Sequence, residues 1–133
     1  MAGFRVNLIE GYKDFVYVSL GSIAGSYLRI TLIKLISLRF SSAYFSTILV
    51  NSLACLLFGM FVTIYIEGLL LFDSFNYLFF ITGFLGSLST FSGFILDQLN
   101  LIMNNKWRES IFAIIISLLS GIILISLGLI VVN

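Results

Sequence analysis

Residues 40–66 read FSSAYFSTILVNSLACLLFGMFVTIYI, and this stretch contains no charged side chain. A helix needs about 20 consecutive apolar residues to cross the hydrocarbon core of a bilayer, so the stretch is long enough for one crossing. Lipid offers the backbone no hydrogen-bond partner, and a helix pairs its own N–H and C=O groups. The stretch therefore predicts a membrane-spanning α-helix.

Three further apolar runs lie on either side of this stretch, at about residues 15–33, 74–96 and 110–132. Each is close to the length of one crossing, and none shows the short alternating segments of a membrane β-barrel. The four runs predict an all-α integral membrane protein, with residues 1–133 forming a single four-helix transmembrane domain. Because the links are short, neighbouring helices should be antiparallel and both chain ends should lie on one side.

The amino-acid composition supports this interpretation. Hydrophobic residues make up 60% of the chain and charged residues 10%, whereas a soluble domain carries about 25% charged residues. The net charge is +1 and the basic residues are scattered, so we expect no nucleic-acid partner. The chain has no histidine and a single cysteine, Cys55, so zinc, haem and disulfide frameworks are not expected. Because no nucleophile–base set is visible, we do not expect an enzyme.

The basic residues at the ends of the runs give a weak signal for orientation. Cytoplasmic links usually carry an excess of Lys and Arg, and this excess sets the topology. The side that holds both termini carries Arg5 and Lys13. The opposite side carries four basic residues, which are Lys34, Arg39, Lys106 and Arg108. A bias of four to two predicts that the chain inserts in both orientations.

Small residues recur along two of the runs. Gly21 and Gly25 form a G-x-x-x-G step in the first run, and Ser117, Gly121 and Gly128 recur on one face of the fourth. In lipid no hydrophobic force drives helices together, so small residues that allow close backbone approach favour their packing. Because four thin helices make a poor pore alone, we expect a dimer or a larger assembly.

Polar side chains within the runs are costly in lipid and therefore point to packing or to transport. Asn51 lies near the middle of the second run, with Thr47 one turn earlier on the same face. Its amide can form an interhelical hydrogen bond or serve a transport path. Arg29 lies deep in the first run, where it can snorkel to the interface or line an aqueous vestibule. These residues alone leave both alternatives open.

The third run contains a dense cluster of Gly, Ser and Thr, which reads GFLGSLSTFSGF at residues 83–94. Such a cluster, in a chain without proline, favours a break in the helix. Broken backbone at membrane depth is tolerated where it is buried in protein or lines a cavity, and its freed carbonyls can bind a cation. Phe91 and Phe94 share one face at an i, i+3 spacing, which lipid-facing and core residues also show.

Three motifs, in this order along the chain, resemble those of the Fluc (CrcB) family of fluoride channels. GSYLR at residues 25–29 resembles the first-span pattern G-x-x-x-R, and TILVN at residues 47–51 resembles the second-span pattern T-L-x-V-N. The stretch at residues 83–94 resembles the third-span signature G-F-x-G-G-x-T-T-F-S-T-F. The resemblance covers all four spans and the length of the chain.

The resemblance implies a dual-topology channel of the plasma membrane. Two antiparallel subunits would form two narrow pores that passively export fluoride from the cytoplasm. Some relatives pair two different subunits, but Asn51, Phe91 and Phe94 are all present here, which favours a homodimer. The implied site residues are Asn51, Phe91 and Phe94 in the pore, Thr47 and Ser117 in a track of hydroxyl groups, Arg29 in a vestibule, and Gly86 and Ser89 as backbone ligands of sodium. That structural sodium ion would lie at the centre of the dimer, where a cation offsets the repulsion between anions.

Two other functions are compatible with four short spans. A small dual-topology multidrug exporter would need a carboxylate inside the membrane to exchange protons for drug. The carboxylates are expected at span ends or in links, and they are Glu10, Asp14, Glu67, Asp73, Asp97 and Glu109. A non-transporting membrane assembly subunit would explain the small residues but not the ordered motifs. The sequence therefore favours the fluoride channel.

Overall fold

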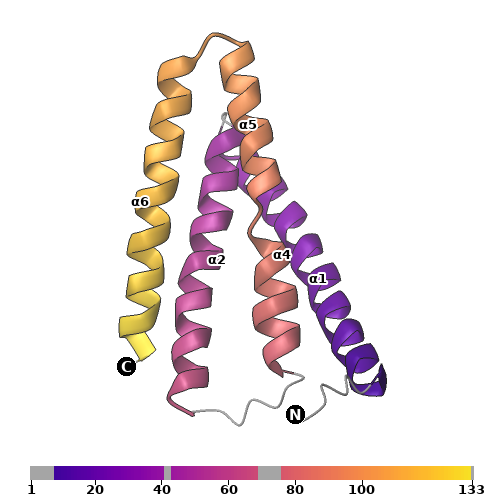
Figure 1. Ribbon diagram of the computed structural model, residues 1–133. Helices are drawn as coiled ribbons and strands as arrows, with labels where there is room; N and C mark the ends of the chain where they lie inside the picture. Colours follow the sequence, from indigo (N-terminus) through magenta and orange to yellow (C-terminus); the bar gives the residue numbers. More distant parts are fainter. Residues whose placement is uncertain (1–7, 41–42, 69–75, 133) are drawn as a thin grey trace, which may run out of the picture.

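The computed structural model describes residues 8–40, 43–68 and 76–132, and all the elements within these ranges are helical. They are α1 (Leu8–Ser37), α2 (Ala43–Ile66), the π-helix η1 (Tyr77–Leu85), α4 (Gly86–Leu88), α5 (Phe91–Met103) and α6 (Trp107–Val132) (Figure 1). In the described part of the chain, four segments are long and apolar enough to cross a membrane, namely Gly11–Ser37, Tyr44–Ile66, Tyr77–Met103 and Trp107–Val132. The predicted all-α membrane protein with four spans is thus confirmed.

The third span ends later than the hydrophobic run that predicted it. α5 continues to Met103 and α6 begins at Trp107, so the link is shorter than expected. Asn105 completes the turn with a positive φ of 57°, which Asn tolerates better than most residues. The expectation that Asp97 lies in a link is therefore wrong, because polar side chains ended the apolar run without ending the helix. The predicted start of this span, at residue 74, lies outside the described residues.

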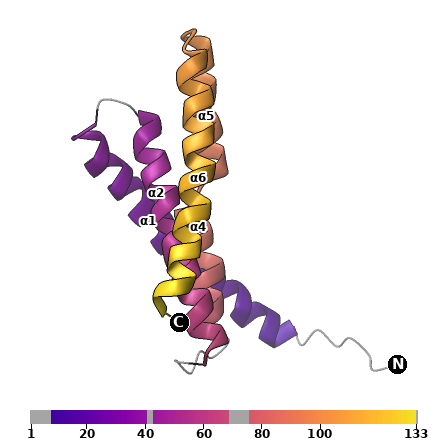
Figure 2. The ribbon, with the colours of Figure 1, turned by 90° about the vertical axis from the view of Figure 1, so that its left-hand side faces the viewer.

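The helices alternate in direction. In Figure 1 the start of α1 and the end of α6 lie at one end of the molecule, and the turn between α5 and α6 lies at the other. α2 packs along α6, while α1 packs along η1 and α4. Figure 2 shows the α5–α6 pair extending beyond the end of α1 and the start of α2. The short links thus produce the antiparallel neighbours that the sequence predicts.

The small residues bring helix backbones into direct contact within the subunit. A Cβ added to Gly25 would overlap the Phe84 carbonyl oxygen and the Ser87 hydroxyl of the third span, so α1 closely approaches η1 and α4. Gly59 of α2 and Gly128 of α6 meet in the same way. A Cβ added at these positions would force the backbones apart, which is why glycine is needed there.

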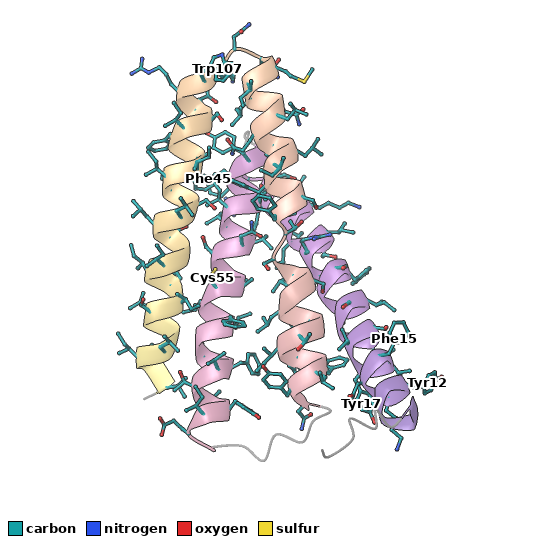
Figure 3. All side chains as sticks on the ribbon, viewed as in Figure 1. Tyr12, Phe15, Tyr17, Phe45, Cys55 and Trp107 are labelled. Atoms are coloured by element: carbon teal, nitrogen blue, oxygen red, sulfur yellow. The ribbon has the colours of Figure 1, made fainter. Side chains whose placement is uncertain are left out.

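Aromatic side chains mark the two ends of the bundle. Figure 3 shows Trp107 at the end formed by the α5–α6 turn, and Tyr12 and Tyr17 near the opposite end. Trp and Tyr are enriched at membrane–water interfaces, where their amphipathic rings lie at headgroup level. Between these ends α6 exposes a row of large apolar side chains, which includes Ile111, Phe112, Ile115, Leu119, Ile122 and Ile130. This surface suits lipid as its solvent.

Candidate functional site

Regular helical structure stops and restarts within the third span. α4 ends at Leu88, α5 begins at Phe91, and the two residues between them have extended backbone. Ser89 has φ −77° and ψ 145°, and Thr90 has φ −143° and ψ 121°. Thr90 is the N-cap of α5, because its Oγ1 accepts a hydrogen bond of 3.2 Å from the Gly93 N–H. This cap gives the start of α5 a fixed position.

The Asn51 side chain of α2 pairs with the backbone of Thr90 at two points. Its Oδ1 accepts from the Thr90 N–H at 2.9 Å, and its Nδ2 donates to the Thr90 carbonyl at 3.2 Å. The interhelical hydrogen bond that the sequence allowed for Asn51 is therefore present. A primary amide carries two N–H donors, and this contact uses one of them. Asn51 both holds the extended segment and lines the adjacent space.

A groove of about 530 Å³ lies between α2, α5 and α6. It brings together the predicted pore residues Asn51, Phe91, Phe94 and Ser117. The remaining lining residues are Cys55, Ser89, Thr90, Ile95, Gln98, Ile102, Ser110, Ile114 and Leu118. Amide, hydroxyl and aromatic groups thus share a cavity whose other walls are mostly apolar.

Three residues of the predicted site do not line this groove, namely Thr47, Arg29 and Gly86. Thr47 is 5% exposed and is buried in α2, one turn before Asn51. Arg29 is half-buried on α1, which packs against η1 and α4 and contributes no residue to the groove. The structure therefore gathers the predicted pore phenylalanines, amide and serine, and leaves Arg29 apart from them.

The two phenylalanines occupy different environments. Phe91 is 78% exposed, although it lies on the groove. Phe94 is half-buried and packs against the cluster formed by Ile48, Leu101 and Ala113. The subunit therefore fixes Phe94 by its own packing and leaves the Phe91 side of the groove open.

The groove also contains polar residues that sequence reasoning did not select. Ser110 Oγ donates to Gln98 Oε1 at 2.7 Å, and both side chains are buried. Gln98 follows Phe94 by four residues, so the i, i+4 spacing could have placed it on the same face of α5. Thr90 lies in the motif at residues 83–94. Its pairing with Asn51 joins segments far apart in the sequence, so no local sequence pattern predicts it.

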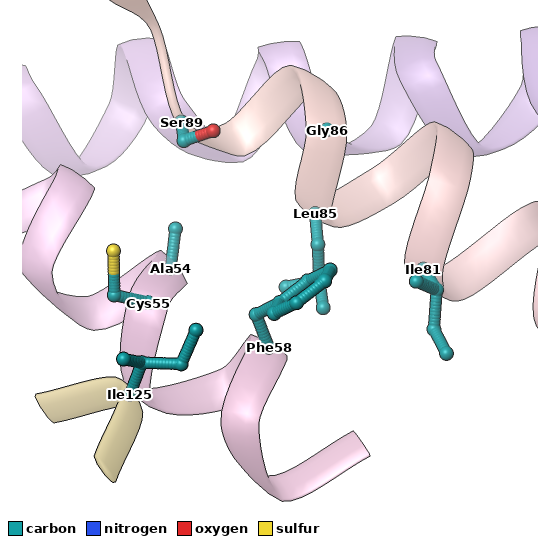
Figure 4. A pocket seen from close by; sticks show the side chains of 8 residues that line it. All are labelled: Ala54, Cys55, Phe58, Ile81, Leu85, Gly86, Ser89 and Ile125. Atoms are coloured by element: carbon teal, nitrogen blue, oxygen red, sulfur yellow. The ribbon is translucent and has the colours of Figure 1, made fainter. Parts of the chain in front are cut away.

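A second, smaller cavity contains the two residues expected to bind sodium. Its volume is about 210 Å³, and Figure 4 shows Gly86 and Ser89 among the residues that line it. A continuing helix would direct the Thr90 N–H to the Gly86 carbonyl, but this N–H is donated to Asn51 instead. The Gly86 carbonyl thus lacks its helical donor, and apart from its own helix backbone and chain neighbours nothing lies within 4 Å of where a Gly86 Cβ would be. Because hard cations prefer oxygen ligands, these residues fit sodium.

The four segments that are long and apolar enough to cross a membrane define a multi-pass membrane protein. Residues 16–129 match the family model described as CrcB-like protein, Camphor Resistance (CrcB). The chain therefore belongs to the CrcB family. This confirms the resemblance noted from the three motifs.

Curated relatives match nearly the whole chain. The "Fluoride-specific ion channel FluC 2" of Prochlorococcus marinus is 37% identical over 125 residues, which are 90% of this chain and 92% of that protein. The "Fluoride-specific ion channel FluC" of Haemophilus influenzae (strain PittGG) is 32% identical over 117 residues, covering 88% and 91%. That of Haemophilus ducreyi is 34% identical over 118 residues, covering 89% and 90%. The chain is thus a multi-pass protein of the cell membrane.

Proposed function

We propose that this chain is a subunit of a passive fluoride channel in the cell membrane, and not an enzyme. Its family and the names of its relatives support fluoride as the transported ion. The observation that carries the proposal is the groove that unites Asn51, Phe91, Phe94 and Ser117. In the cell the channel would release fluoride that had entered as neutral HF and ionised in the cytoplasm.

The lining groups can replace the water around a small anion. Fluoride is strongly hydrated, so a narrow pore must offer hydrogen-bond donors in place of that water. Asn51 has a second N–H beyond the one bound to Thr90, and Ser117 has a hydroxyl. The positive ring edges of Phe91 and Phe94 can also contact an anion. In this proposal Thr47 and Ser117 belong to the hydroxyl track.

The functional unit in this proposal is an antiparallel homodimer. The weak bias of basic residues allows both orientations, although Arg5 lies outside the described residues. The high exposure of Phe91 supports a dimer, because a second copy would close the groove that one subunit leaves open. The extended segment at residues 89–90 would lie at membrane depth, and Arg29 would face a vestibule.

Sodium is the structural cation of this proposal. The carbonyls of Gly86 and Ser89 would hold it, since both residues line the same cavity and the Gly86 carbonyl has lost its helical donor. When bound, the ion supplies positive charge that offsets the repulsion between anions in neighbouring pores. The break in the third span thus has a role in binding as well as in shape.

Liposomes that contain the purified protein are expected to release internal fluoride and to retain chloride. A fluoride electrode and a chloride electrode measure the two effluxes, and protein-free liposomes are the control. Equal chloride release would contradict a fluoride channel. Fluoride movement that requires a proton gradient would instead point to proton-coupled export. The Asp97 carboxylate within the third span would then be the candidate for the proton-exchanging group.

Labelling at the α5–α6 link is expected to reach the protein from both sides of the membrane. Lys106 is exposed in this link, so a Lys106→Cys change in a Cys55→Ala background gives a single reactive thiol. A membrane-impermeant thiol reagent should label one fraction from outside and the remainder only after the vesicles are opened. Complete labelling from one side, in protein that still conducts, would exclude the dual-topology homodimer.

A further inference from the structure

Gln98 is a buried amide with one unused end. The side chain is 6% exposed, yet it lies on α5 within the lining of the groove. In the described part of the chain its Nε2 has no hydrogen-bond partner, while its Oε1 accepts from the Ser110 hydroxyl at 2.7 Å. Buried side-chain donors are nearly always paired, so an unpaired amide N–H group beside a cavity calls for a ligand.

In the structure Ser110 faces the oxygen end of the Gln98 amide. Its side chain is 3% exposed at the start of α6, and its hydroxyl holds the oxygen of Gln98. With Oε1 held, the N–H donors of Nε2 remain for the groove. The neighbouring carboxylate, Asp97, is not among the groove-lining residues. The unpaired end is therefore a neutral donor, which attracts an anion and not a cation.

The position of Gln98 extends the line of groups that would contact fluoride. It follows Phe91 by seven residues and Phe94 by four, so the three side chains share one face of α5. The rise of about 1.5 Å per residue places Gln98 about 6 Å beyond Phe94 along the helix. Asn51 contacts the residue just before Phe91, so the phenylalanine pair has an amide near each end.

We propose that the Gln98 amide is a second anion-binding position in the groove. This inference rests on the proposed fluoride function, and it names a donor that none of the three family motifs contains. A neutral amide binds an anion less tightly than a cationic side chain would, so the ion can leave again. Ser110 is the positioning residue that orients this amide.

Two substitutions separate an anion donor from a structural residue. Gln98→Met removes both ends of the amide. Gln98→Glu keeps an oxygen that accepts the Ser110 hydroxyl, but at alkaline pH its carboxylate offers no donor and repels anions. Both variants are expected to lower fluoride efflux by about tenfold or more and to raise the fluoride concentration that gives half-maximal efflux.

The matched control is Asn100→Asp, which makes the same amide-to-carboxylate change at an exposed position of α5, two residues away. It should leave efflux close to wild type. Thermal unfolding and size-exclusion profiles establish that each variant is folded. If Gln98→Glu releases fluoride at the wild-type rate while Gln98→Met loses efflux, the residue only ties α5 to α6. That result would overturn the proposal.

A binding measurement keeps this test separate from the transport function. Purified protein in detergent should broaden the ¹⁹F resonance of free fluoride, and the broadening should decrease in both Gln98 variants but not in Asn100→Asp. If the wild-type protein conducts no fluoride, the channel proposal is refuted but the anion position at Gln98 is not. Broadening that is unchanged in both Gln98 variants would refute the anion position at Gln98, whatever the transport result.

Discussion

Asn51→Leu is expected to lower fluoride efflux by about a hundredfold, because two contacts disappear together. The free N–H of the amide can no longer reach the anion. In addition, the Thr90 N–H and C=O lose the partners that hold the extended segment beside the groove. Liposome efflux, scaled to the amount of folded protein, measures the effect.

Asn51→Leu is also expected to lower the stability of the protein, so stability must be measured together with efflux. Each Thr90 backbone group left unpaired costs about 1–3 kcal/mol, so the unfolding temperature in detergent should decrease. Thr63→Val is the matched control, since it removes a buried hydroxyl of α2 outside the groove, which donates to the Gly59 carbonyl at 3.0 Å and lies 3.4 Å from the Leu129 carbonyl of α6. This control should lose stability and keep its efflux. Normal efflux from folded Asn51→Leu would show that the Asn51 amide does not contact the transported anion.

Phe91→Ile is expected to lower fluoride efflux by up to about tenfold while leaving the fold of the subunit intact. Isoleucine keeps much of the apolar volume but has no positive ring edge for the anion, and such ring interactions are worth about 0.5–1.5 kcal/mol each. Phe91 is 78% exposed in the subunit, so little intramolecular packing is lost. Efflux and the unfolding temperature, measured on the same preparation, separate the two effects.

Substitutions of two further phenylalanines serve as comparisons for Phe91→Ile. Phe94→Ile should lose efflux and also some stability, because its ring packs on the buried cluster of Ile48, Leu101 and Ala113. Phe112→Ile changes an exposed ring on α6 that does not line the groove, and it should conduct normally. Normal efflux from both Phe91→Ile and Phe94→Ile would mean that these rings serve only packing or lipid contact.

The sequence predicts the four spans well, because each contains a long apolar run and lipid tolerates little else. It fails at the end of the third span, where Asp97 and Gln98 interrupt the apolar run but not the hydrogen bonding of α5. Periodicity places Phe91 and Phe94 on one face. It does not show that Phe91 is exposed whereas Phe94 is packed, since these environments depend on α2 and α6.

Long-range pairing explains the rest of what the sequence could not provide. The amide of Asn51 was compatible with several partners, and its choice of Thr90 depends on how α2 meets the third span. Gly25 indicated a close helix contact, but only the structure identifies Phe84 and Ser87 as the groups it accommodates. Gln98 lies beyond the motif at residues 83–94, and its i, i+4 spacing from Phe94 places it on the same face without showing that its amide pairs with Ser110 of α6.

The extended residues between α4 and α5 have a consequence for how the chain is assembled during synthesis. The chain contains no proline, so no residue lacks the N–H that a continuous helix requires. It is the Asn51 side chain that removes the Thr90 N–H from the helical pattern. A newly inserted third span, still surrounded by lipid, would have to pair its own backbone and would therefore enter as one uninterrupted helix. We therefore expect the interruption to form when α2 docks against the third span and Asn51 pairs with Thr90.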